Sequence, residues 1–535
     1  MMTKQPQPQN AHLQINANDP QGVIERIWAN IGYDELNWTY TTRGKALLRT
    51  LNNDIFTQGD YTVRMHNTFT TGNGLSSPAW GAGNVYHTRV DGSAYYDWQV
   101  LDQAFDAIVK NGGVPLVELG FTPLDLTPPD LRATGFKTVS DQGLNQYEFE
   151  LWKKPPADEM RWGELVKALV QHVVDRYGAT EVKKWMFELW NEPDIPNYWQ
   201  GTVEEYNRLY DVSAAAVKSV LPEAAMGGPA TTGFVCGAQW LEQFLAHLNT
   251  QGTRPDFISF HTKGAFFAPR RIYNPDQAAP YESHSTTYML GEIERSLKVI
   301  EQFPAFRNVP IYLDECDPAV GTIYGVYDNP NFIITNSEHY PTFVCQLVAK
   351  LLDYPQIKRI THWAFYMEGK RWFEGNRTLV DNENVEKPIL NGLRMLEKLA
   401  GTQRLQTQSD NEKVGVLAGK TGETIYLLVW HHDDDWRADG LAHITISLEI
   451  NAPNSDATIW RIDKNHANTY RTWEALGAPQ DPSPEQIAVI RQGGQLQAEP
   501  IPLVRNQTQT QLHLAMPMHS LALIEIKPIY SLAQD

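Results

Sequence analysis

The feature that most constrains this 535-residue chain is a regular alternation of predicted strands and helices between residues 26 and 400. Short apolar runs typical of buried strands alternate eight times with longer amphipathic segments. The predicted strands span residues 26–31, 61–66, 114–121, 184–192, 224–228, 256–261, 309–315 and 359–365. A doubly wound sheet would alternate in the same way. The count of eight, and the polar residues that close several strands, favour an α/β fold of the (β/α)8 TIM-barrel type.

The pattern changes after Gly401 to short alternating strands separated by turn residues. This arrangement is typical of an all-β sandwich, which we expect as an additional domain. Residues 12–16 are also strand-like and could join that sandwich. We therefore predict an N-terminal tail over residues 1–20, a catalytic barrel over 21–401 and a C-terminal β-sandwich over 402–535.

Composition excludes several classes of partner. The formal net charge is −18, and no block of five or more like charges occurs, which argues against nucleic acid or an anionic membrane surface. No run approaches the roughly 18 apolar residues of a membrane span. The first ten residues lack the apolar segment of a secretory signal, so we predict a cytoplasmic protein. The three cysteines have a spacing that fits neither a disulfide framework nor a zinc site.

Two of the predicted strands end in carboxylates, at Asn191-Glu192-Pro193 and at Asp314-Glu315. The carboxyl ends of the strands carry the chemistry in a parallel barrel. Two carboxylates on either side of a glycosidic bond are what glycoside hydrolysis requires. We interpret Glu192 as a general acid/base, because burial among aromatic residues would raise its pKa as that role needs. The alternative is a structural carboxylate at the start of a helix.

The choice between Asp314 and Glu315 stays open at this point. Strand alternation sends consecutive side chains to opposite sides, so only one of the two is expected to face the barrel mouth. The pair could instead form a salt bridge behind the site. If the mechanism retains configuration, the second catalytic carboxylate must stay ionised about 5 Å from Glu192.

Other polar and aromatic residues close neighbouring strands. His66 follows Arg64 on the same face of the second strand, and His261 closes the sixth strand. Asn191 can hydrogen-bond a sugar hydroxyl while remaining neutral, and Trp363 is either a sugar platform or barrel packing. The spacing of the histidines and Glu315 does not suggest a metal. No glycine-rich loop follows the first strand, so dinucleotide binding is not indicated.

Taken together, these residues resemble glycoside hydrolase family 39, the β-xylosidase and α-L-iduronidase group. The likeness is carried by Arg64-Met65-His66 and by residues 105–106, 117–123, 187–193, 227–230, 257–262 and 311–315, with 461–463, Asn468 and Trp473 in the tail. The resemblance implies that Glu192 is the acid/base and Glu315 the nucleophile, with retention of configuration and no cofactor. It places His66, Asn191, His261 and Trp363 at sugar-contacting positions, and it implies possible homo-oligomers.

The chain departs from the β-xylosidases of that family around the predicted pocket. Lys263 stands where they usually have an aromatic residue, Cys316-Asp317 replaces Trp-Asn, and the loop with Glu368 and Lys370 differs. We count Lys263 and Glu368 among the candidate substrate-binding residues. The first hypothesis is an exo-acting β-xylosidase on plant-type oligosaccharides. The alternatives are an α-L-arabinosidase or other glycosidase on branched oligosaccharides, and a carbohydrate-binding protein that has lost catalysis.

Overall fold

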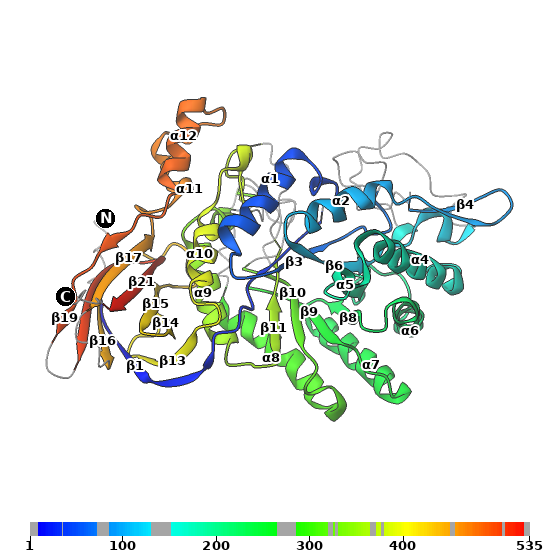
Figure 1. Cartoon of the computed structure of the whole chain (residues 1–535), viewed down its shortest axis with the longest axis horizontal. Helices are drawn as coiled ribbons and strands as arrows, with labels where there is room; N and C mark the ends of the chain where they lie inside the picture. Colours follow the sequence, from blue (N-terminus) through cyan, green and yellow to red (C-terminus); the bar gives the residue numbers. More distant parts are fainter. Residues whose placement is uncertain are drawn as a thin grey trace, which may run out of the picture.

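The protein consists of a barrel packed side by side with a β-sandwich, and the first and last strands that the structure describes both belong to the sandwich (Figure 1). The computed structural model describes residues 9–34, 36–71, 85–129, 151–264, 285–318, 325–326, 330–363, 371–375, 379–449, 455–505 and 509–528. The candidate residues Glu368 and Lys370 lie outside this described part of the chain.

The barrel strands are all parallel and follow the order β11-β10-β9-β8-β7-β6-β3-β2-β12. They span β2 Asn30–Tyr33, β3 Tyr61–Met65, β6 Gly113–Leu119, β7 Met186–Leu189, β8 Ala225–Thr231, β9 Phe257–Lys263, β10 Ile311–Asp317, β11 Ile357–Ile360 and β12 His362–Trp363. β11 pairs with β10, and β12, the continuation of the same strand, pairs with β2. Because this last strand joins both ends of the sheet, the predicted eight-stranded barrel is confirmed.

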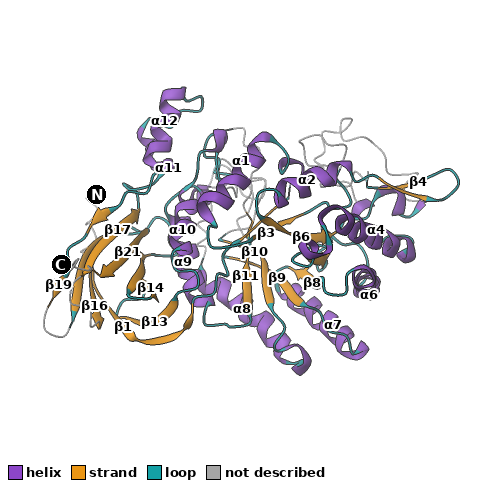
Figure 2. Ribbon diagram, in the orientation of Figure 1, coloured by secondary structure: helices purple, strands orange, loops and turns teal. Residues whose placement is uncertain are grey.

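Helices surround the barrel strands on the outside (Figure 2). They are α1 Thr42–Thr50, α2 Gln99–Val109, α4 Glu159–Tyr177, α5 Ala179–Val182, α6 Val203–Val220, α7 Val235–Gln251, α8 Thr286–Glu301, α9 His339–Leu351 and α10 Pro388–Glu397. Local sequence sets where several begin. Thr202 and Glu205 form a capping box at the start of α6, and the Ser285 side chain caps α8. A small hairpin, β4 Tyr86–Thr88 and β5 Ala94–Tyr96, stands apart from the barrel.

Two predicted barrel strands differ from the structure. The first begins at Asn30 rather than residue 26, because the buried Ile27 and Trp28 lie in a turn that links the barrel to the sandwich. The apolar pattern of these residues therefore indicates burial and not pairing in a β-sheet. The eighth strand is broken between Ile360 and His362, where the chain changes its partner from β10 to β2.

The sandwich is one ten-stranded sheet in the order β18-β17-β21-β15-β14-β13-β1-β16-β20-β19. Its strands are β1 Gln9–Val23, β13 Gln403–Ser409, β14 Val414–Thr421, β15 Thr424–His431, β16 Leu441–Glu449, β17 Ser455–Ile462, β18 Glu499–Pro500, β19 Val504–Arg505, β20 Thr510–Pro517 and β21 Ser520–Pro528. Leu13 and Ile15 of β1 share one buried cluster with residues from both halves of the sheet. The sheet therefore folds over a single core, and β1 lies between its halves.

The other face of the sandwich packs on the barrel. Leu417, Leu428 and Leu521 belong to the same buried cluster as the inner residues of α9 and α10, so strand alternation supplies one apolar face to each core. Two helices that the all-β prediction missed, α11 Thr469–Ala475 and α12 Pro484–Gly493, are inserted between β17 and β18. They pack with Phe373 into a separate small cluster beside the sandwich.

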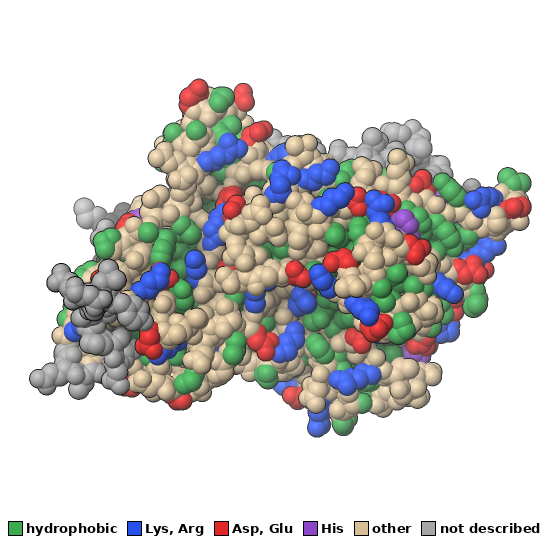
Figure 3. All heavy atoms as spheres, in the orientation of Figure 1, with side chains coloured by type: hydrophobic (Ala, Val, Ile, Leu, Met, Phe, Trp, Pro, Cys, Tyr) green, Lys and Arg blue, Asp and Glu red, His purple; other side chains and the backbone are tan. Residues whose placement is uncertain are grey.

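The surface shown in Figure 3 carries acidic and basic side chains close to one another, without a continuous basic patch on this face. Some of them form exposed ion pairs, such as Lys358 with Glu25 at 2.7 Å. Among the described residues, no helix combines the length and the apolarity needed to cross a bilayer.

Candidate active site

Glu192, His261 and Glu315 meet at the carboxyl end of the barrel strands. Glu192 follows β7, His261 lies on β9 and Glu315 lies on β10. The Nδ1 atom of His261 is 2.8 Å from Oε1 of Glu192 and 3.7 Å from Oε2 of Glu315. Donor atoms of all three residues lie within 4.8 Å of one another. The distance between the carboxylate oxygens of Glu192 and Glu315 is therefore close to the separation of about 5 Å between the two catalytic carboxyl groups of a retaining glycosidase.

A tight backbone turn presents Glu192 to the centre of the barrel. Trp190 and Glu192 both have positive φ angles, of 66° and 43°, in a region that costs about 1–3 kcal/mol per non-glycine residue. The turn is held by a hydrogen bond from the Glu192 amide to the Ala230 carbonyl (2.9 Å). The Trp190 indole N–H donates to the Tyr198 carbonyl, also over 2.9 Å. Trp190, which precedes Asn191 and Glu192, is fully buried. Its packing therefore fixes the turn.

Asp314 and Glu315 both point into the barrel, contrary to the expectation from strand alternation. Oδ2 of Asp314 and Oε1 of Glu315 each lie 3.4 Å from nitrogens of the same Arg64 guanidinium. The register of β10 against β9 shifts between Leu313 and Cys316. An irregularity of this kind breaks the alternation of side chains, and the sequence pattern alone could not reveal it.

Arg64 on β3 is fully buried beneath the two glutamates and is surrounded by carboxylates. Its Nε lies 2.7 Å from Glu188, and its Nη2 lies 3.3 Å from Glu118. Burial disfavours the charge of Arg64, but these carboxylates outweigh it and raise the pKa of the guanidinium. Burial and the negative charge of Glu188 raise the pKa of Asp314 well above its usual range. Both effects favour the protonated form of Asp314, and a proton there would lower the net negative charge of the cluster.

His66 lies between Glu118, one of the carboxylates around Arg64, and Glu315. Burial lowers the pKa of His66, but the charge of Glu118 and hydrogen bonds to Glu118 and Glu315 prevail and raise it to about 9. Its Nε2 lies 3.6 Å from Glu315 and 3.4 Å from Asp34. At neutral pH His66 is therefore a cation that faces Glu315.

Lys263 does not offer a free positive charge to a substrate. Its ammonium lies 2.8 Å from Glu315 and 2.5 Å from Asp317, and its side chain is only 9% exposed. Asp317 in turn accepts a hydrogen bond from the backbone N–H of Trp363 (3.0 Å). The lysine and Asp317 that distinguish this chain form a pair with each other.

The pKa values of Glu192 and Glu315 are shifted in opposite directions. Burial and the charge of Glu315 raise the pKa of Glu192 to about 7. Burial would also raise the pKa of Glu315, yet its charged and hydrogen-bonded neighbours hold it well below the usual range. His261 is buried and its pKa falls to about 3, so it is uncharged. The charges that keep Glu315 ionised are therefore those of Lys263, Arg64 and His66.

Asn191 and Trp363 complete the described part of the site. Asn191 accepts a hydrogen bond from Arg64 (3.0 Å), and its buried Nδ2 has no hydrogen-bond partner among the described residues. Trp363 is 1% exposed, and its ring centroid lies 4.7 Å from that of His66. A Cβ atom at Gly32 would lie 2.3 Å from that indole. Trp363 is thus packed into the barrel, while Asn191 retains a donor for a ligand.

Sequence reasoning missed the carboxylates that support the site, namely Glu118, Glu188 and Asp317. A signal was present, since an acidic residue inside an otherwise apolar barrel strand must find a cationic partner when buried. Arg64 was the matching cation on a neighbouring strand. Nothing in the sequence indicated which carboxylates it would bind.

Comparisons with known proteins show which family the chain is similar to. The sequence model of glycosyl hydrolases family 39 matches residues 46–507. A β-xylosidase from Caldicellulosiruptor saccharolyticus is 26% identical over 82% of this chain and 84% of its own length. A β-xylosidase from Geobacillus stearothermophilus is 27% identical over 86% of each chain. The crystal structure of a monomeric β-xylosidase from Caulobacter crescentus superposes with a TM-score of 0.76, with 22% identity, covering 97% of this chain and 100% of that one.

Proposed function

Because this chain belongs to glycosyl hydrolase family 39, we propose that it is a retaining exo-glycosidase acting on β-D-xylosides, with Glu192 as acid/base and Glu315 as nucleophile. The observation that carries the proposal is that two glutamates meet at the carboxyl end of the barrel in surroundings that shift their pKa values in opposite directions. A carboxyl group with a pKa near 7 can donate a proton at neutral pH, and an ionised carboxylate beside it can attack carbon.

The proposed reaction has two steps. In the first, an oxygen of Glu315 attacks the anomeric carbon while Glu192 gives its proton to the departing glycosidic oxygen, which leaves as an alcohol. In the second, Glu192 takes a proton from water, and the resulting hydroxide displaces Glu315 from the sugar. Each displacement inverts the anomeric carbon, so the two together retain its configuration.

The surrounding residues have supporting roles in this proposal. Neutral His261 binds Glu192 through Nδ1 and fixes the direction of the acid. Lys263, Arg64 and His66 keep Glu315 ionised before attack and stabilise it again as a leaving group. The Nδ2 amide of Asn191 is available to donate to a sugar hydroxyl beside the bond that breaks.

The sugar is proposed from the relatives that are named β-xylosidases, and a panel of aryl glycosides tests it. The panel contains a β-xyloside, an α-L-arabinofuranoside, an α-L-arabinopyranoside, a β-galactoside and a β-glucoside. We expect the highest kcat/KM on the β-xyloside. Preference for an arabinoside would mean that the enzyme is an arabinosidase and not a xylosidase. Binding of xylo-oligosaccharides without turnover of any substrate would favour a carbohydrate-binding protein.

The pH dependence of kcat/KM should report the two glutamates. Glu192 must be protonated to act as the acid, so we expect activity to fall about tenfold per pH unit above an apparent pKa near 7. The acidic limb should lie well below pH 4.5, where Glu315 gains a proton. Rates are measured on a substrate with a poor leaving group. A profile that stays flat from pH 6 to 9 would contradict the assignment of the acid.

The substitution Glu192→Ala should affect substrates according to their leaving groups. Loss of general acid catalysis lowers rates by about 10²–10⁴-fold when the leaving oxygen needs a proton. An aryl glycoside with an acidic phenol needs little assistance and should lose far less in its first step. Azide should restore turnover by attacking the glycosyl-enzyme in place of activated water. An equal loss on both substrate types would rule out the acid role.

Replacing Lys263 with methionine should move the acidic limb of the pH profile upward. The variant removes one of the cations that hold the pKa of Glu315 low and leaves Glu315 beside Asp317. The basic limb, which depends on Glu192, should move less. The control is Lys358→Met, which breaks an exposed ion pair and should leave both limbs in place. If the acidic limb of the Lys263 variant matches wild type, the lysine has no electrostatic role.

A further inference from the structure

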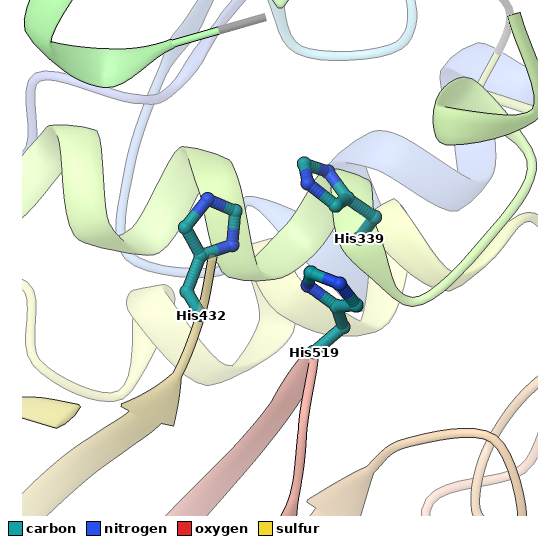
Figure 4. A group of neighbouring side chains, drawn as sticks. All are labelled: His339, His432 and His519. Carbon is teal, nitrogen blue, oxygen red and sulfur yellow. The ribbon is translucent and has the colours of Figure 1, made fainter. Parts of the chain in front are cut away.

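Three histidines meet where the barrel and the sandwich join, away from the glutamate pair. His339 opens α9 of the barrel, His432 follows β15, and His519 precedes β21. All three are buried, and one ring nitrogen of each lies within 4.8 Å of the others. Their rings point toward one another from separate elements (Figure 4). The ring of His339 has its centroid 4.7 Å from that of His432 and also 4.7 Å from that of His519.

Backbone carbonyls hold the outer nitrogens of two of these rings. Nε2 of His339 lies 3.2 Å from the carbonyl oxygen of Asp433, and Nε2 of His519 lies 3.1 Å from that of Asp435. A carbonyl can only accept, so each Nε2 carries the hydrogen. In the neutral tautomers that result, the lone pair of each ring is on Nδ1. The Nδ1 atom of His519 is buried and has no hydrogen-bond partner in the described part of the chain.

The tautomer of His432 follows from Thr342 in the same way. The hydroxyl of Thr342 donates its hydrogen to the carbonyl of His339 (2.8 Å) and lies 2.9 Å from Nδ1 of His432. With its hydrogen used, the hydroxyl accepts from His432, which leaves the lone pair of that ring on Nε2. This Nε2 is buried without a hydrogen-bond partner among the described residues and is 3.4 Å from a carboxylate oxygen of Asp434.

We propose that His339, His432 and His519 bind a zinc ion that joins the sandwich to the barrel. A ring N–H held by a carbonyl or hydroxyl is typical of histidine ligands to zinc, which bind the metal through the other nitrogen, and one nitrogen of each of these three buried rings lies within 4.8 Å of the others. A cation bound by the three rings gives a partner to the buried Nε2 of His432 and to the buried Nδ1 of His519, neither of which has a hydrogen-bond partner among the described residues.

Zinc titration of the full-length chain, stripped with EDTA, tests this proposal. We expect one ion per chain, and a midpoint of thermal unfolding that rises with zinc, because the ion binds only when both domains are in place. His432→Gln and His519→Gln should each weaken binding on the order of 100-fold or more, since a lost ligand costs more than a lost supporting residue. Thr342→Ala keeps all three ligands and should weaken binding by about tenfold.

Two control variants make the result specific. His443→Gln alters an exposed histidine on β16 of the same sandwich and should bind zinc as wild type does. Glu315→Gln alters the other group of donors, with Glu192 and His261, and should also keep the single ion. If wild type takes up no ion, the three histidines are packing residues of the domain junction and the proposal is wrong. Retention of zinc by the His432 and His519 variants, or its loss in Glu315→Gln, would equally overturn the proposal.

Discussion

The substitution Glu315→Gln should lower kcat/KM on the best substrate by at least about 10⁴-fold, or roughly 5 kcal/mol of transition-state stabilisation. The amide has nearly the same shape as the carboxylate but cannot form the covalent bond to the sugar. It also has no negative charge for Lys263 and Arg64 to stabilise, which lie 2.8 and 3.4 Å from the oxygens of the native carboxylate. Steady-state rates on an activated aryl glycoside measure this loss. Such a substrate needs little help from the general acid, so the lower rate reflects the missing nucleophile.

Stability must be followed alongside the rate of this variant. The surface substitution Glu25→Gln removes an exposed carboxylate that is paired with Lys358 and provides a control for assay and folding. A folded Glu315→Gln enzyme that still binds product, but does not turn over, would agree with the nucleophile role. Turnover within tenfold of wild type would mean that another group attacks the sugar.

The second large effect is on folding. Replacing Arg64 with methionine should reduce the free energy of unfolding by about 3–5 kcal/mol, because it removes the cation from a set of fully buried carboxylates. Arg64→Lys should recover only part of this loss, since an ammonium cannot reach Glu118, Glu188 and Asn191 in one plane. Chemical denaturation of the three proteins gives the values, with reversibility checked by refolding.

A matched control for Arg64 exists on the surface. Arg404 forms an ion pair with Asp353 over 2.8 Å, in which Asp353 is 67% exposed, so Arg404→Met should cost no more than about 1 kcal/mol. A similar small cost for Arg64→Met would show that the buried carboxylates take up protons and need no cation. In that case the stability of the variant should increase as the pH falls, because protonation removes the unpaired charges.

The fold and the central pair were predictable because both depend on strongly patterned local sequence. Eight apolar strands alternate with amphipathic helices, and Glu192 and Glu315 each close one of those strands. Chain order and strand parallelism then bring the strand ends to one side of the barrel. These features require no knowledge of distant contacts.

What could not be predicted depends on pairing between distant strands. The shift in β10 that turns both Asp314 and Glu315 inward arises where β9 and β10 lose register. The partner of Lys263 is Asp317, 54 positions away, and no local pattern encodes such a choice. The histidines at the domain junction come from three separate elements, so their spacing in the sequence carried no sign of a common site.

The position of β1 in the sandwich has a consequence for synthesis of the protein. This strand is parallel to β16 and antiparallel to β13, and its partners lie roughly 380 to 430 residues further along the chain. When a ribosome makes the chain, the first strand of the sandwich emerges before the whole barrel, and the others emerge after it. The barrel can fold as its helices appear, whereas residues 9–23 have no sandwich strand to pair with until β13 has left the exit tunnel. A C-terminal fragment made alone would lack the strand that joins the two halves of its own sheet.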